Sequence, residues 1–209
     1  KFRFGTSKFI TIEGVKIWAQ RLSYVGELGY ELYVQLKDAK KIYELIILKG
    51  KNFNLCNCGV HAMDIMRMES GFLHWGHDIS PEENQYEAGL NFAVSFKKRE
   101  DFIGKENLLK IKVKKQNKRF IMLSLINSKP GKPLLLHDEP IYLENEIIGR
   151  TTSGSYSFNY KKNISFGYVN TKFSLDELKN KKIYIEVENK KYQAIIESKP
   201  LKSKIFKSL

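Results

Sequence analysis

The sequence predicts an α+β fold, in which a mixed α/β subdomain is followed by a small antiparallel β-barrel. In the first half, segments with alternating apolar residues stand beside segments with helical spacing. In the second half, short apolar runs are separated by turn residues at fairly regular intervals, as in small barrels or sandwiches. A basic run at residues 110–119 separates these patterns. We therefore place a domain boundary between residues 1–113 and residues 114–209.

The composition indicates a globular protein with an apolar core. The 209 residues are 42% hydrophobic and carry a formal net charge of +13. No apolar run approaches the roughly 20 residues that cross a bilayer, and the start of the chain has no secretory signal. We expect a soluble protein of the cytoplasm, or of the mitochondrial matrix in a eukaryote. The lysines are spread along the chain and are not interleaved with aromatic residues, so we expect neither a nucleic-acid nor a membrane partner.

A β-hairpin is predicted at residues 15–36, where apolar side chains alternate on both sides of a turn at residues 25–29. An amphipathic helix follows at residues 39–48. Asp38 is its expected cap and Gly50 its expected end. The helix is expected to cover one face of the hairpin.

Two further helices are predicted at residues 60–70 and 101–113. The first of them has an expected apolar stripe formed by Val60, Met63, Ile65 and Met66. Between the helices lies a loop rich in aromatic and His residues. In this loop, residues 80–83 read Ser-Pro-Glu-Glu and predict a short helix, with Ser as cap and Pro in the first turn.

The second half predicts a series of short strands. They are expected at residues 120–125, 141–143, 147–152, 164–169, 183–187 and 192–197. The hydroxyl-rich stretch 151–155 has no His placed to activate a nucleophile, and we interpret it as a turn with local side-chain to backbone hydrogen bonds.

Few sequence motifs point to catalysis or cofactor binding. There is no Gly-rich dinucleotide or nucleotide loop. Two cysteines one residue apart, Cys56 and Cys58, favour a reducing compartment over a disulfide framework. Together with His61, His74 and His77 they contain zinc-type ligands, but the spacing fits no zinc finger. We predict no metal site.

The predicted hairpin brings Tyr24 close to Glu31. An aromatic ring beside a carboxylate suits a planar heterocycle with adjacent N–H donors, such as a pterin or guanine, because the ring stacks and the carboxylate accepts two hydrogen bonds. A cross-strand Tyr–Glu pair on a solvated face explains the same spacing. From the spacing alone both interpretations remain open.

At these residues the chain resembles the glycine cleavage T-protein (aminomethyltransferase) family. The resemblance is nearest to the C-terminal folate-binding modules of dimethylglycine and sarcosine dehydrogenases, through the Trp-Gly-His-Asp-Ile stretch at 75–79 and the Thr-Ser-Gly-Ser-Tyr-Ser stretch at 152–157. Matching motifs run in order along the chain, at residues 23–32, 67–71, 74–79, 87–90, 102–105 and 151–157.

The resemblance implies site residues. Glu31 would bind the pterin ring of tetrahydrofolate, and Tyr24 would line the same pocket. The Arg that T-proteins use on the following helix is replaced by Met63, so that contact is expected to be absent. Arg67 and Glu69 also match a family motif, and we interpret them as part of a structural ion pair.

The resemblance also implies a role within a larger enzyme. There, FAD on another domain or subunit oxidises an N-methyl amine, and tetrahydrofolate accepts the one-carbon unit to give methylene-tetrahydrofolate. The family's catalytic Asp and the flavin domain have no counterpart in this sequence. The chain is therefore expected to be a fragment or one subunit, and inactive alone. The alternatives are a T-protein of glycine cleavage and a non-catalytic folate-binding regulatory protein.

Overall fold

The computed structural model describes residues 2–114 and 116–202. The chain divides into two compact units. The first contains the chain up to Ser70 together with Lys202, and the second contains Gly71–Leu201. The mixed helix and strand content and a closed barrel confirm the predicted α+β class.

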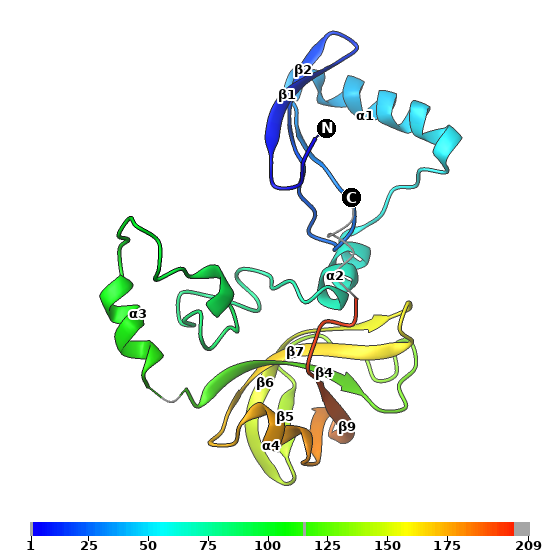
Figure 1. The fold of residues 1–209 in the computed structure, drawn as a ribbon. Helices are drawn as coiled ribbons and strands as arrows, with labels where there is room; N and C mark the ends of the chain where they lie inside the picture. The colour runs from blue at the N-terminus through cyan, green and yellow to red at the C-terminus, as the bar shows by residue number, and fades with distance from the viewer. Residues whose placement is uncertain (1, 115, 203–209) are drawn as a thin grey trace. The chain divides into compact units, whose positions relative to one another are not determined.

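The first unit is built on a three-stranded antiparallel sheet in the order β1-β2-β3 (Figure 1). Its strands are β1 (Ser7–Ile12), β2 (Val15–Gln20) and β3 (Glu31–Tyr33). Its helices are α1 (Leu36–Gly50), the 3-10 turn η1 (Lys51–Phe53) and α2 (Val60–Glu69).

Helix α1 lies against one face of this sheet (Figure 1). The core between them contains Val15, Ile17 and Ile42, which are at most 9% exposed. Val15 and Ile17 are two positions apart in β2 and therefore point to the same face of the sheet. Burial of each such side chain contributes about 1.5–3 kcal/mol. The alternation of β2 thus decides which face α1 covers.

The predicted hairpin is correct in its strand pairing and wrong in its turn. β2 pairs with β3, but residues 21–30 form a loop where a tight turn was expected. β2 also pairs along its full length with β1, a strand that was not predicted. The N–H of Arg21 donates to the carbonyl of Thr6 at 2.9 Å, so the backbone after β2 bonds to the β1 side and not across a turn.

The ends of α1 also differ from the prediction. Its N-cap is Gln35, and Asp38 lies inside the first turn. Gly50 has a helical φ of −68° and continues into η1, and the left-handed residue that ends the helical segment is Asn54, with φ 55°. Asn tolerates that conformation better than most residues with a side chain, so it can replace Gly as a C-cap.

Helix α2 has the predicted position but a different buried face. Met68, Arg67 and Glu69 are at most 1% exposed, whereas Val60 is 64% exposed and Met63 38% exposed. The expected apolar stripe is therefore wrong for this helix. The last turn of α2 is buried, and it contains two charged residues, Arg67 and Glu69.

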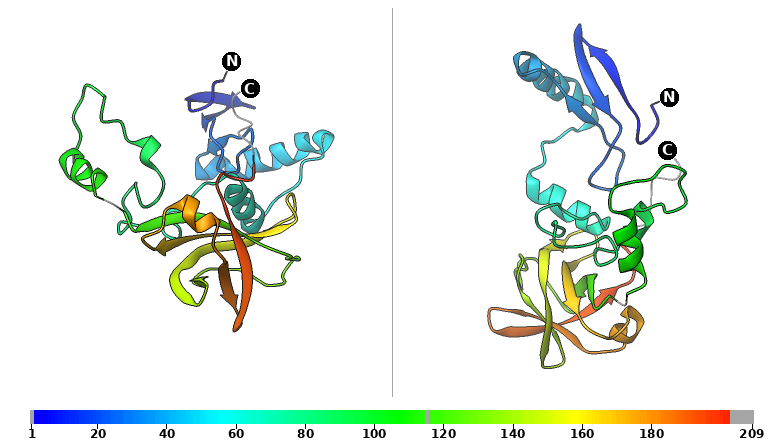
Figure 2. Two further views of the ribbon diagram at one scale, coloured as in Figure 1. Left: turned by 60° about the horizontal axis from the view of Figure 1, so that its bottom comes forward. Right: turned by 90° about the vertical axis from the view of Figure 1, so that its left-hand side faces the viewer.

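The second unit is a closed six-stranded barrel in the order β4-β7-β6-β5-β8-β9, with β9 paired to β4 (Figures 1 and 2). Each predicted strand is present. They are β4 (Lys118–Leu125), β5 (Pro140–Leu143), β6 (Glu146–Ser157), β7 (Lys162–Asn170), β8 (Ile183–Val187) and β9 (Lys190–Glu197). Leu123, Ile141 and Ile185, which have no exposed surface, belong to the barrel core.

The other helices of this unit are short. α3 (Lys105–Lys112) begins four residues later than predicted, after Gly104 at φ 85°. η2 (Asn91–Ala93) and α4 (Leu175–Lys179) were not predicted, although Ser174 and Glu177 form a complete capping box at α4. At residues 80–83, Ser80 Oγ accepts a hydrogen bond of 3.1 Å from the Glu82 N–H, as an N-cap residue does, but these residues form a turn and not a helix.

Candidate functional site

The loop that contains Tyr24 is fixed at its centre by contacts within the first unit. Gly26 has φ 68°, and a Cβ at this position would lie 2.0 Å from Ser70 Oγ. Ser70 Oγ and Lys202 Nζ both donate to the carbonyl of Val25, at 3.3 and 3.4 Å. Lys202 also pairs with the carboxylate of Glu27. The loop is therefore held to the end of α2 and to the C-terminal segment.

Glu31 is exposed at the start of β3 and accepts a hydrogen bond of 2.8 Å from the Tyr33 hydroxyl. This hydrogen bond raises the pKa of Tyr33, because it stabilises the protonated donor. Each carboxylate oxygen can accept two bonds. Glu31 therefore keeps acceptor capacity for a ligand.

Strand register places Glu31 on a face of the sheet rich in aromatic side chains. Trp18 is directly opposite Phe9 on one side and Tyr33 on the other. The rings of Phe9 and Trp18 lie 4.7 Å apart in an edge-to-face arrangement. Gln20 is opposite Glu31. We call this surface, formed by Phe9, Trp18, Gln20, Glu31 and Tyr33, the aromatic face.

The aromatic face is the side of the sheet opposite α1. Trp18 and Gln20 alternate along β2 with Ile17 and Ala19, which are fully buried. Phe9 is 58% exposed and Tyr33 54% exposed. Exposed aromatic side chains grouped in this way are typical of a binding surface. The contribution of Phe9 was missed from the sequence because β1 was not predicted.

The structure puts the two predicted folate residues in one strand–loop segment. The loop containing Tyr24 begins after Gln20 and ends before Glu31, and these two residues are cross-strand partners. Tyr24 is half-buried in the loop, and Glu31 is exposed at its base. The predicted cross-strand pairing of Tyr24 with Glu31 is wrong, because β2 ends at Gln20.

Two positions on helix α2, Met63 and Arg67, differ in their exposure. Met63, at the position where T-proteins use an Arg, is partly exposed on α2. Arg67 is buried and pairs with Asp64 one turn earlier, with a distance of 2.8 Å from Nε to Oδ1. Arg67 is therefore part of an ion pair, as expected, but this pair joins two residues of α2, so the expected anchoring of the loop by Arg67 and Glu69 stays a prediction.

In the second unit, Asp78 joins two of the sequence motifs. It is 1% exposed, and its Oδ2 accepts a bond of 2.9 Å from the His74 N–H. Its Oδ1 accepts bonds from the hydroxyls of Thr152 and Ser153, at 2.5 and 2.7 Å. The interpretation of residues 151–155 as a turn with local hydrogen bonds is therefore wrong.

A bulge explains this arrangement. Adjacent strand residues normally point to opposite faces, but the register of β6 shifts between Thr151 and Ser153. The shift lets both neighbouring hydroxyls reach the same oxygen of Asp78. The motif at residues 75–79 thus has a structural role, the attachment of its loop to the barrel.

Cys56 and Cys58 are both free and exposed. Within residues 2–114 and 116–202, no three His, Cys, Asp or Glu side chains form a group that could hold a metal ion. In the same described part, no helix is long and apolar enough to cross a membrane.

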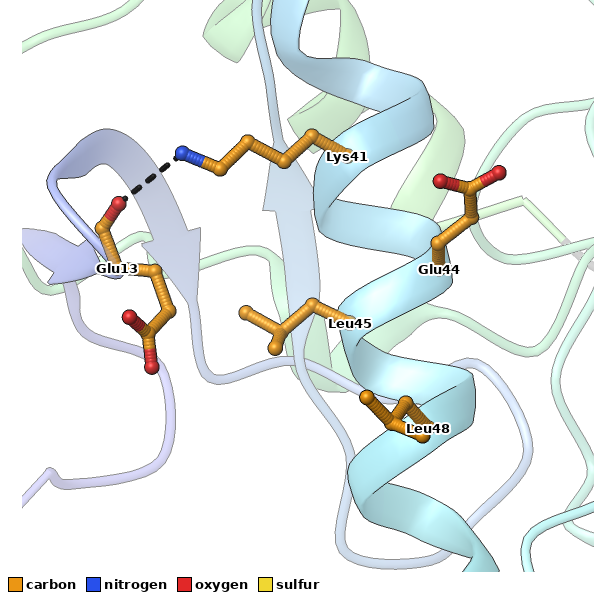
Figure 3. A pocket seen from close by; sticks show the side chains of 5 residues that line it. All are labelled: Glu13, Lys41, Glu44, Leu45 and Leu48. Atoms are coloured by element: carbon orange, nitrogen blue, oxygen red, sulfur yellow. Dashed lines mark hydrogen bonds between the residues drawn. The ribbon is translucent and has the colours of Figure 1, made fainter.

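An open hollow of about 390 Å³ lies between α1 and the β1–β2 turn (Figure 3). Lys41 reaches across it and donates to the carbonyl of Glu13 at 3.2 Å, and Leu45 and Leu48 line the same side of the helix. None of its lining residues belongs to the aromatic face. We interpret the Lys41 contact as the attachment of α1 to the turn.

Comparisons with known proteins identify the family. A model described as the GCVT N-terminal domain matches residues 1–98, and the glycine cleavage T-protein C-terminal barrel domain matches residues 118–202. The chain belongs to the aminomethyltransferase (glycine cleavage T-protein) family. The family resemblance inferred from the motifs is confirmed.

Relatives of two kinds are found. Human mitochondrial dimethylglycine dehydrogenase is 34% identical over 200 residues, which are 96% of this chain and 22% of that protein. An aminomethyltransferase of Symbiobacterium thermophilum is 35% identical over 167 residues, which are 79% of this chain and 44% of that protein. The chain thus spans between about a fifth and a half of the length of these relatives.

A solved structure supports the fold. The aminomethyltransferase T of the glycine cleavage system from Bartonella henselae aligns with a TM-score of 0.80 at 21% identity, covering 95% of this chain and 52% of that one. This similarity extends over both units.

Proposed function

We propose that this chain is the C-terminal tetrahydrofolate-binding part of a dimethylglycine or sarcosine dehydrogenase-like enzyme. In this proposal, residues 1–113 form part of the folate-binding domain and residues 114–209 form the C-terminal barrel domain. The one-carbon unit comes from an oxidised N-methyl amine, and the product is methylene-tetrahydrofolate. The chain alone is inactive, and the enzyme acts in the cytoplasm or the mitochondrial matrix.

The observation that carries the proposal is the exposed carboxylate of Glu31 beside aromatic rings. A pterin presents adjacent N–H donors at one edge and a flat apolar face. A carboxylate accepts such donors bidentately, and aromatic side chains stack against the ring. Glu31 meets the first requirement, and Tyr24 in the adjacent loop meets the second. The residues present therefore fit a reduced folate.

The residues of this chain would act by positioning. Tetrahydrofolate, when bound, supplies the nucleophilic nitrogen that accepts the one-carbon unit. Glu31 fixes the orientation of the pterin, and the Tyr33 hydroxyl restrains the carboxylate of Glu31. The contacts at Gly26 and Val25 keep the Tyr24 loop in place. Such preorganisation favours reaction through proximity.

The sequence contains no Gly-rich dinucleotide loop of the kind that holds FAD. We assign the flavin, the N-methyl amine and the oxidation step to a partner domain or subunit on the N-terminal side. The proposal includes no nucleic-acid or membrane partner. The relation to human dimethylglycine dehydrogenase supports a flavin partner.

An aminomethyltransferase of glycine cleavage is the second candidate function, supported by the Symbiobacterium relative and the Bartonella structure. The absorption spectrum of the full polypeptide that carries this sequence distinguishes the two. Bound flavin that dimethylglycine or sarcosine reduces favours the dehydrogenase. A flavin-free protein that transfers an aminomethyl group from a lipoyl carrier favours the aminomethyltransferase.

Calorimetric titration of tetrahydrofolate into the full polypeptide tests the site. Glu31→Gln keeps the size of the side chain but removes its charge and one acceptor oxygen. We expect the Kd to rise about tenfold to a hundredfold, the range for hydrogen bonds to a charged group. Glu44→Gln on the exposed side of α1 removes the same charge and should leave the Kd unchanged. Equal folate affinity with and without the Glu31 carboxylate would show that the assignment is wrong.

A further inference from the structure

The segment between η1 and α2 carries two thiols on a short stretch of chain. Cys56 and Cys58 are separated by one residue, and both are free and exposed. Residues 55–59 have no regular secondary structure, but the segment is fixed at each end. The Leu55 N–H donates to the carbonyl of Gly50 at 3.0 Å, and Gly59 is the N-cap of α2. The two cysteines therefore lie between two fixed points of the first unit.

The residue between the cysteines is tied to α1. Asn57 Nδ2 donates to the Tyr43 hydroxyl at 2.8 Å. This bond holds the middle of the segment by its side chain, whereas the thiols on either side stay open to solvent. Soluble reagents can therefore reach both sulfur atoms of the pair.

The two thiols lie within hydrogen-bonding reach of each other. A hydrogen bond with Cys56 raises the pKa of the Cys58 thiol, and the negative charge of an ionised Cys56 raises it further. A thiol that keeps its proton is a poor nucleophile, because the thiolate is the attacking species. Cys56 is therefore the thiol that attacks first, and Cys58 is the one that follows.

The spacing allows the two sulfur atoms to join. A disulfide needs Cα atoms that are about 4.4–6.8 Å apart. Two residues of fully extended chain span about 7 Å, so a local bend at Asn57 is enough to close the ring. Such a bend acts directly on the residue that bonds to Tyr43. Oxidation of the cysteines would therefore loosen the attachment of this segment to α1.

We propose that Cys56 and Cys58 form a reversible oxidation site that reacts with glutathione disulfide. The Cys56 thiolate attacks one sulfur of glutathione disulfide, the S–S bond of that molecule breaks, and one glutathione leaves as a thiolate with the electron pair. Cys58 then loses its proton to solvent, and its thiolate attacks the Cys56 sulfur and releases the second glutathione. The cysteines are oxidised to one disulfide, and glutathione disulfide is reduced to two glutathione molecules. Excess glutathione reverses the exchange.

Mass spectrometry of the full polypeptide tests the site after treatment with glutathione disulfide, thiol capping and trypsin. Cleavage after Lys51 and Arg67 gives a peptide of residues 52–67 that contains both cysteines. In the parent we expect this peptide to be uncapped and lighter than its reduced form by two hydrogen atoms, and dithiothreitol should reverse the change. Cys56→Ser and Cys58→Ser should each keep one bound glutathione, which the parent loses. A parent peptide that stays fully capped, or that keeps glutathione without closing the ring, would overturn the proposal.

A second measurement tests the bend at Asn57. In buffers of glutathione and glutathione disulfide, Tyr43→Phe should shift the equilibrium constant toward the disulfide about two- to tenfold, the factor for one neutral hydrogen bond. Tyr30→Phe removes a hydroxyl elsewhere in the first unit and should leave the constant unchanged. Equal constants in the parent and Tyr43→Phe would overturn the link between oxidation and the α1 contact. Neither folate nor flavin takes part in the exchange, so the result is independent of the proposed function.

Discussion

Replacing Asp78 should destabilise the second unit by an amount that depends on which hydrogen bonds survive. The carboxylate is buried and accepts hydrogen bonds from the hydroxyls of Thr152 and Ser153 and from the His74 N–H. Asp78→Asn can keep these bonds, because its oxygen can accept from the fixed N–H while both hydroxyls rotate to accept from its amide. Only the charge assistance is lost, at a cost of about 1 kcal/mol.

Asp78→Ala removes every acceptor at once. The His74 N–H and the hydroxyls of Thr152 and Ser153 lose their partner in a buried site, and each loss costs on the order of 1 kcal/mol. We therefore expect a total of about 3 kcal/mol. For a unit of this size, that corresponds to a fall in Tm of roughly 6–12 °C.

Thermal unfolding followed by circular dichroism measures both variants. Hydrogen exchange over residues 74–79 shows whether the loop separates from the barrel first, which would appear as lost protection in the Ala variant. Asp176→Ala is the control, since Asp176 is 91% exposed and its pair with Lys179 should contribute under 1 kcal/mol. An Ala variant no less stable than the Asn variant would refute the argument from unsatisfied partners.

Two further predictions concern single contacts. Burial alone would raise the pKa of Glu83, but hydrogen bonds, chiefly from Lys118, outweigh it and lower that pKa. Glu83→Gln should therefore be less stable than the parent by on the order of 1 kcal/mol at pH 7. The difference should begin to shrink as the pH falls below the unfolded pKa of about 4.3, and it should be lost as the pH passes through the lowered pKa of the folded state. Urea titrations from pH 7 to 3 measure it, and a gap that does not shrink over this range contradicts the reasoning. Gly26→Ala should lower the free energy of unfolding by more than about 2 kcal/mol, because of the positive φ and the clash with Ser70. Gly14→Ala, with φ 78° and open space at the Cβ, should lower it by only about 1 kcal/mol. Equal losses of Tm in the two variants would count against the clash.

Alternation and turn chemistry were sufficient to predict the strands of the barrel. Its strands bury one side in a common core, so residues such as Leu123 and Ile185 recur with period two and are visible in the sequence. For helix α2, the recurrence of apolar residues predicted the wrong buried face. Its buried end consists of Arg67, Met68 and Glu69, and a pattern that counts only apolar residues cannot detect charged residues that are buried with partners.

The sequence by itself determined the α+β class, the positions of the barrel strands along the chain, the family and the two residues proposed to contact folate. These depend on local periodicity and on motifs, which one chain displays directly. Only the tertiary structure decided which faces those residues share. Strand register placed Phe9 and Trp18 beside Tyr33, on the same face as Glu31. The bulge in β6 brought two hydroxyls to Asp78 across more than seventy residues. Register and bulges arise from hydrogen bonds between distant strands, and no local sequence pattern specifies those pairs.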